Sequence, residues 1–67
     1  MINIKVNDIN QQFSSSLTIE QLVFKLQIVT NGIAIAINDS VIKKESWETK
    51  ELKNNDKVLI IKSTQGG

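Results

Sequence analysis

The sequence predicts an α+β fold, with one helix packed on one face of a mixed four- to five-stranded sheet. Residues 2–6 and 33–37 alternate large apolar side chains with polar or small ones, as strands with one buried face do. Residues 19–28 space apolar side chains as a helix does, and 58–61 form the continuous apolar run of a central strand. The chain has 67 residues, which is the size of one small domain.

The first two strands are expected to form a hairpin. Asn7 and Asp8 follow the first strand, and both residue types tolerate the positive φ angles of a tight turn. Residues 9–13 then return as the partner strand. The serine run 14–16 predicts a loop, and a phosphate-contacting hydroxyl cluster is the alternative interpretation.

The single helix is predicted from its cap and its apolar face. Thr18 is the expected N-cap, and Gln21 can complete a capping box three residues later. Asn31 and Gly32 supply a left-handed stop, which predicts a helix over about residues 19–28. Its apolar face is formed by Ile19, Leu22, Val23 and Leu26.

The second half of the chain is expected to complete the sheet. The isoleucines of 33–37 face the helix, a turn follows at 38–40, and 41–42 form a short strand. Trp47 is expected to pack in the core rather than to stack on a ligand. After a turn at 54–56 comes the last strand, which gives a ββαββ order with the first and last strands in central positions.

Composition excludes several classes of function. There is no histidine and no cysteine, so the chain has no imidazole base, thiolate nucleophile, disulfide or soft-metal site. The net charge is +1, and the lysines are scattered among acids without the basic stripe of a nucleic-acid interface. No apolar stretch approaches the length of a membrane span. We therefore expect neither a nucleic-acid nor a membrane partner, and a monomer in the cytoplasm, or in an organelle stroma if the gene is plastid-encoded.

A partner-docking surface is expected on the sheet face that the helix cannot cover. Alternation within 58–61 sends two apolar residues to each face of the sheet. We expect Leu59 and Ile61 on the uncovered face, with Lys62 beside them, because exposed apolar clusters on small proteins mark interaction sites. The alternative interpretation is that residues 41–53 partly cover this face.

The C-terminal residues carry the remaining chemical signal. Residues 1–62 are expected to form the domain and 63–67 a flexible tail, because no apolar side chain anchors it. Gly66 and Gly67 have no Cβ, so they can thread a narrow channel in any backbone conformation. The group that such a tail delivers is the unhindered, ionised α-carboxylate of Gly67.

Taken together, these segments resemble the ThiS-type sulfur carriers of the ubiquitin-like β-grasp family. The resemblance extends over essentially the whole chain. The matching segments are the strand 2–7, the helix 18–26, the Ala-Ile-Asn stretch within 35–42, residues 45–47, the turn 55–56 and the diglycine Gly66-Gly67.

The resemblance implies a carrier that is not itself an enzyme. A ThiF-like adenylating enzyme, using ATP and Mg, would activate the Gly67 carboxylate while Thr64, Gln65 and Gly66 thread its active site. A sulfur donor protein would then convert the adenylate to a thiocarboxylate, and thiazole synthase would accept the sulfur for thiamine biosynthesis. The chain itself would hold no metal and no cofactor.

Other functions share the same fold and tail. The chain departs from the family pattern at Lys43-Lys44, where Pro-Arg is frequent, and at Ser63-Thr64-Gln65, where apolar residues are usual. The alternatives are a sulfur carrier for tRNA thiolation or molybdopterin, a protein modifier joined to lysines through Gly67, and a β-grasp interaction module whose tail is incidental. A higher-mass conjugate in cells would indicate the modifier, and function without Gly67 would indicate the module.

Overall fold

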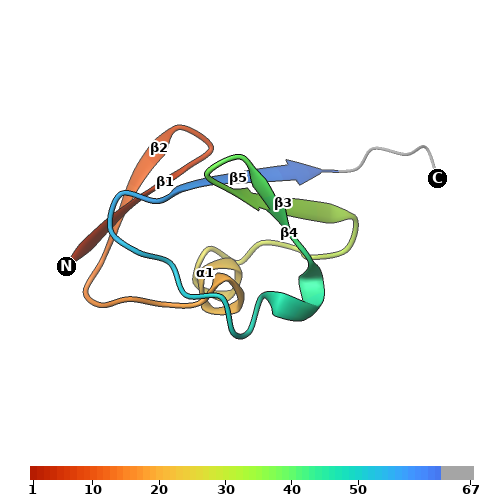
Figure 1. Ribbon diagram of the computed structural model, residues 1–67, viewed down its shortest axis with the longest axis horizontal. Coiled ribbons are helices and arrows are strands. Elements are labelled where there is room, and N and C mark those ends of the chain that lie inside the picture. Colours follow the sequence, from red (N-terminus) through yellow and green to blue (C-terminus); the bar gives the residue numbers. More distant parts are fainter. Residues whose placement is uncertain (63–67) are drawn as a thin grey trace.

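A five-stranded mixed sheet covered on one face by a helix forms the fold (Figure 1). The computed structural model describes residues 1–62. It confirms the α+β class, corrects the predicted ββαββ order to ββαβββ, and adds a short 3₁₀ helix, η1, before the last strand. The elements in chain order are β1 (Ile2–Val6), β2 (Ile9–Phe13), α1 (Ile19–Lys25), β3 (Ile33–Ile37), β4 (Ser40–Ile42), η1 (Lys44–Ser46) and β5 (Lys57–Lys62).

The sheet places the first and last strands in its interior, as the sequence predicts. The strand order is β2-β1-β5-β3-β4. β1 and β5 are parallel neighbours, whereas β1–β2, β3–β4 and β3–β5 pair antiparallel. Parallel neighbours require a long crossover, and here the crossover includes α1 and the β3–β4 hairpin.

Two hairpin turns of the same kind connect β1 to β2 and β3 to β4. Asn7 and Asp8 have φ angles of 49° and 69°, and Asn38 and Asp39 have 49° and 73°. Positive φ at both central residues is the type I′ geometry, whose twist matches that of the paired strands. Asparagine and aspartate reach this region because their short polar side chains bond locally. Both predicted turns are therefore confirmed.

The helix begins as predicted and ends earlier. The Thr18 hydroxyl accepts from the Gln21 backbone N–H at 3.2 Å, and the Gln21 side-chain oxygen accepts from the Thr18 N–H at 2.9 Å, which completes the capping box. The expectation of a helix to residue 28 is wrong. Lys25 is its last residue, and the left-handed stop is Gln27 (φ 55°), not Gly32.

The early stop has a structural cause in the closure of the last helical turn. The Ile28 N–H bonds the Val23 carbonyl at 3.0 Å, and the Gln27 N–H bonds the Phe24 carbonyl at 3.1 Å. These two bonds form a Schellman motif, which satisfies carbonyls that the helix end leaves free. The reversal lets Ile28 pack against the same core as the helix.

The core lies between the sheet and α1 and continues into the connection before β5. Trp47 is buried there, as expected, and its Nε1 donates to the Ile42 carbonyl at 3.1 Å. Leu17 and Leu52 are also buried, and the Leu52 N–H bonds the Leu17 carbonyl at 2.8 Å. The core cluster comprises Ile4, Val6, Leu17, Ile19, Leu22, Val23, Ile35, Ile37, Trp47, Leu52 and Val58.

The connection between β4 and β5 packs beside the start of α1. The Ile19 N–H bonds the Lys50 carbonyl and the Glu20 N–H bonds the Trp47 carbonyl, both at 3.1 Å. Trp47 also belongs to the core on the helix side of the sheet. This segment therefore packs on the helix side of the sheet. The alternative that residues 41–53 partly cover the opposite face is wrong for the residues after β4.

Candidate functional site: the uncovered face of the sheet

The face of the sheet opposite α1 carries a cluster of apolar side chains from three adjacent strands. In the sheet register Ala34 lies beside Ile61, and Ala36 lies beside both Leu59 and Val41. Alternation along each strand puts these residues on the same face. We call this cluster the outer patch, and it consists of Ala34, Ala36, Val41, Leu59 and Ile61.

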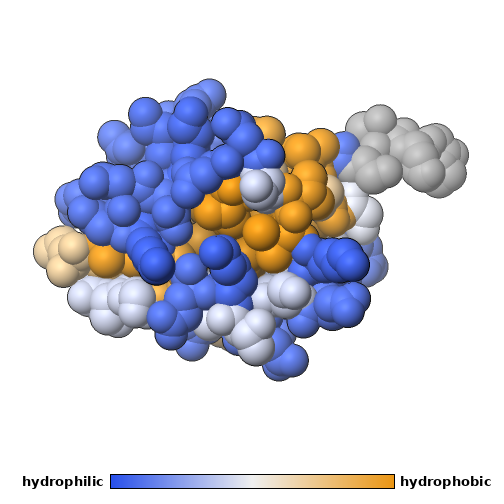
Figure 2. Space-filling view, viewed as in Figure 1, coloured by the Kyte–Doolittle hydropathy of each residue, from blue (hydrophilic) through white to orange (hydrophobic). Residues whose placement is uncertain are grey.

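The large side chains of the outer patch are exposed to solvent. Leu59 is 49% exposed, Ile61 is 45% exposed and Val41 is 68% exposed. Because the alanines of β3 are small, they cover little of the larger Leu59 and Ile61 side chains beside them on β5. Figure 2 shows hydrophobic residues gathered over β3, β4 and β5, whereas the β1–β2 hairpin is hydrophilic.

Two lysines border the outer patch on the side of the β1–β2 hairpin. Lys5 of β1 and Lys57 of β5 are direct partners in the parallel register, and both are exposed. Alternation places Lys57 on the same face as Leu59 and Ile61. A partner surface with apolar residues at its centre and acids on one side would complement this arrangement.

The structure brings together two of the three residues expected to dock a partner. Leu59 and Ile61 lie in the outer patch, so their expected exposure is confirmed. Lys62 instead alternates to the helix side of the sheet, where it pairs with Ile33. There it lines a groove of about 430 Å³ together with Ile28 and Val29, among others.

The remaining predicted site residues lie beyond the part of the chain that the structure describes. Thr64, Gln65, Gly66 and Gly67 all lie outside residues 1–62. These residues follow directly on β5, which ends at Lys62, the residue after Ile61 of the outer patch. At roughly 3.5 Å per residue, a carboxyl group on Gly67 can lie at most about 20 Å from Ile61.

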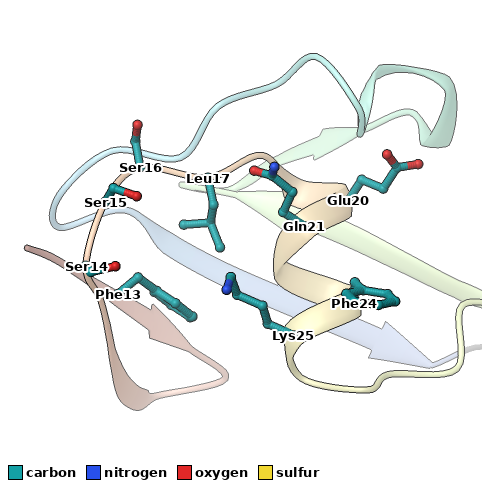
Figure 3. Close-up of a pocket in the computed structure, with 9 residues that line it drawn as sticks. All are labelled: Phe13, Ser14, Ser15, Ser16, Leu17, Glu20, Gln21, Phe24 and Lys25. Carbon is teal, nitrogen blue, oxygen red and sulfur yellow. The ribbon is translucent and has the colours of Figure 1, made fainter.

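A second cavity lies between the 14–16 loop and α1 and has a volume of about 750 Å³. Figure 3 shows Phe13, Leu17 and Lys25 pointing into the space between the loop and the helix. The Gln21 carboxamide at its rim is already bonded in the capping box. The other polar groups of the lining are serine hydroxyls, Glu20 and Lys25, and we assign no chemistry to it.

Residues 1–62 contain no cluster of three or more acidic, histidine or cysteine side chains that could hold a metal ion. The helices within the same range are all too short or too polar to cross a bilayer. Ala34, Ala36 and Val41 were missing from the predicted surface, although alternation already placed the alanines of β3 opposite the buried isoleucines.

Comparison with known proteins gives the family. A sequence model of the ThiS family matches residues 2–67, which is nearly the whole chain and includes the diglycine. The chain belongs to the ThiS family. The resemblance seen in the sequence is thereby confirmed, and with it membership of a family of sulfur carriers.

Individual ThiS proteins are similar to this chain over nearly its whole length. The sulfur carrier protein ThiS of Escherichia coli K12 is 27% identical over 66 residues, which cover 98% of this chain and 100% of that protein. The crystal structure of the thiamine biosynthesis protein ThiS from Geobacter metallireducens superposes with a TM-score of 0.86 at 22% identity, covering 98% of this chain and 100% of that one. The solution structure of the thiamine biosynthesis protein from Geobacter metallireducens superposes with a TM-score of 0.78 at 22% identity, covering 98% of this chain and 88% of that one. The fold is thus the β-grasp of ThiS.

Proposed function

We propose that this ThiS protein carries sulfur for the thiazole stage of thiamine biosynthesis, as a thiocarboxylate on Gly67. The observation that supports this most is the family match, which runs to Gly67 and so includes the diglycine. The names of the relatives, a sulfur carrier and a thiamine biosynthesis protein whose structure was solved both in crystals and in solution, agree with it.

The proposed chemistry begins with activation of a poor acyl donor. A carboxylate oxygen of Gly67 displaces pyrophosphate from ATP, which gives an acyl adenylate and a good leaving group, AMP. Sulfide, released by a donor protein, then attacks the carbonyl carbon and AMP leaves. The product is a thiocarboxylate in which sulfur replaces one oxygen, and thiazole synthase takes up that sulfur.

Apart from the Gly67 carboxylate, partner proteins must supply the reactive groups for these steps. The chain has no histidine or cysteine, so the ATP site, its magnesium and the sulfur donor belong to other proteins. Its own contribution is an accessible carboxylate and a surface on which a ThiF-like adenylating enzyme can dock. We assign that docking to the outer patch, with Leu59 and Ile61 as its central residues, because it is uncovered and directly precedes the tail.

The test is the mass of the C-terminal fragment after incubation with ATP, the adenylating enzyme of the same organism and a sulfur donor. The proposal predicts exchange of one oxygen for sulfur on Gly67, dependent on ATP. Fragmentation is required because oxidation of Met1 adds nearly the same mass. An unmodified Gly67, with the enzyme shown to be active on another carrier, would refute the proposal and favour an interaction module.

Deletion of Gly66 and Gly67 provides the matched control. We expect complete loss of sulfur loading and a melting temperature within about 2 °C of the full chain, because glycine contributes no side chain to a core. A fall of many degrees would show that the diglycine stabilises the domain. A lysine-linked conjugate in place of the thiocarboxylate would identify a protein modifier instead.

A further inference from the structure

Strand β5 is held near both ends by asparagine side chains from the two hairpin turns. In the β3–β4 turn, the Asn38 side-chain oxygen accepts from the N–H of Lys57, the first residue of β5, at 3.0 Å. In the β1–β2 turn, the Asn7 side-chain oxygen accepts from the N–H of Ile60 at 2.7 Å, and its Nδ2 donates to the Ile60 carbonyl at 3.4 Å. One carboxamide therefore bonds the start of the strand and the other its second half.

Asn7 continues the pairing between β1 and β5 after the β1 backbone has turned away. The Asn7 backbone N–H bonds the Val58 carbonyl at 2.9 Å, and the chain then enters the turn with a φ of 49° at Asn7. A carboxamide carries the same donor and acceptor as a peptide group. Its oxygen therefore bonds the Ile60 N–H in place of the Asn7 backbone carbonyl, and its Nδ2 bonds the Ile60 carbonyl as a backbone N–H of a longer β1 would.

The position of this contact matters because β5 leads into the tail. Ile61 and Lys62 follow Ile60, and β3 pairs with both of them on the other side of β5. On the β1 side, Asn7 extends the support of the strand from Val58 to Ile60. The end of β5 is thus held on one side by strand β3 and on the other by the Asn7 side chain.

We propose that Asn7 is a positioning residue for activation of the C-terminus. By fixing the backbone of Ile60, it holds Leu59 and Ile61 of the outer patch in a constant position relative to Lys62, the last residue of β5. An enzyme docked on the patch then always finds the end of β5, from which the chain continues towards Gly67, at the same place. This inference rests on the proposed function.

The two turns offer a matched pair of variants. Asn7-Asp8 and Asn38-Asp39 are the same dipeptide with nearly the same φ angles. Glycine adopts positive φ without steric cost, so Asn7→Gly and Asn38→Gly remove a carboxamide and leave each turn possible. The first loses the contact near the tail, and the second loses the contact at the opposite end of β5.

The experiment measures ATP–pyrophosphate exchange by the adenylating enzyme of the same organism, together with amide hydrogen exchange in the free protein. For Asn7→Gly we expect faster exchange at the Ile60 amide and a kcat lower by about tenfold, the factor that loss of about one hydrogen bond represents, with KM within about twofold. Asn38→Gly should expose the Lys57 amide and leave kcat within about twofold of wild type. Equal kcat for the two variants, or an Ile60 amide still protected in Asn7→Gly, would overturn the proposal.

Two further comparisons separate the possible failures. If Asn7→Gly does not fold, Asn7→Asp takes its place. This variant keeps an acceptor for the Ile60 N–H and loses the donor, so its kcat should lie between the wild-type value and one about tenfold lower. A wild-type kcat in Asn7→Asp would refute the positioning role. Absence of pyrophosphate exchange with the wild-type protein would refute the proposed function and the positioning role together, whereas normal wild-type exchange with an unaffected Asn7→Gly refutes the positioning role alone.

Discussion

The two faces of the same sheet have opposite properties. On the helix face Ile4, Ile35 and Val58 are buried beneath α1, Trp47 and other residues of the core. On the outer face, β3 places small alanines beside Leu59 and Ile61 of β5, which remain about half exposed. Because β3 and β5 supply both faces, adjacent residues in one strand have different roles.

The difference separates stability from partner binding. Burial of apolar area stabilises the fold only where another element covers the strand, and within residues 1–62 the covering elements lie on the helix face. An apolar side chain that stays half exposed contributes less to stability and remains available to a partner. Substitutions on the helix face should therefore change unfolding, and substitutions on the outer face should change activation of Gly67.

The largest effect on stability is expected from Ile35→Ala. Ile35 is fully buried in the core, so the truncation leaves a cavity and should cost about 2–5 kcal/mol of unfolding free energy. Leu59→Ala on the outer face is the control, and it should cost about 1 kcal/mol or less. Urea unfolding of both variants measures the difference, and equal losses would show that the outer patch is part of the stabilising core.

An intermediate effect, on activation alone, is expected from Ile61→Asp. A carboxylate in the middle of an apolar docking surface must be desolvated on binding, so KM for the adenylating enzyme should rise by about tenfold or more. The melting temperature should change by only a few degrees, since surface substitutions rarely exceed about 0.5 kcal/mol. Val29→Asp is the control, because Val29 is 74% exposed and lies outside the outer patch. A similar rise in KM for both variants, or collapse of the fold in Ile61→Asp, would contradict the assignment.

The smallest effect is expected from Thr18→Ala. This variant removes the hydroxyl that accepts from the Gln21 N–H at the start of α1, which should cost about 1 kcal/mol. The melting temperature should fall by about 4–8 °C, and kcat and KM for adenylation should stay unchanged because the helix lies on the other face. An unchanged melting temperature would show that the capping box does not stabilise the helix, and an altered KM would place part of the docking surface at α1.

Regular patterns in the sequence were sufficient to predict most of the fold. Alternation predicts β1 and β3, the continuous apolar run 58–61 predicts β5, and the Asn-Asp pairs predict both hairpin turns. The helix end was missed because Gln27 adopts a left-handed conformation that its residue type does not suggest. Leu17 and Leu52 were missed because they lie in irregular segments, where no periodicity marks a buried side chain.

The site was predictable to a smaller extent, because it depends on strand neighbours. Alternation within β5 was enough to single out Leu59 and Ile61. The contribution of Val41 depends on the register of β4 against β3, and the contact between Asn7 and Ile60 joins residues 53 positions apart. Neither relation leaves a local pattern in the sequence.

The most direct test of the outer patch as the docking surface is to follow the backbone amide NMR signals while the adenylating enzyme is added. We expect the signals of Ala34, Val41, Leu59 and Ile61 to shift or broaden first, and those of Phe24 on α1 and Val29 to remain unchanged. Changes confined to α1 and the 14–16 loop, with the outer patch unaffected, would contradict the account and place the docking surface at the cavity beside the helix.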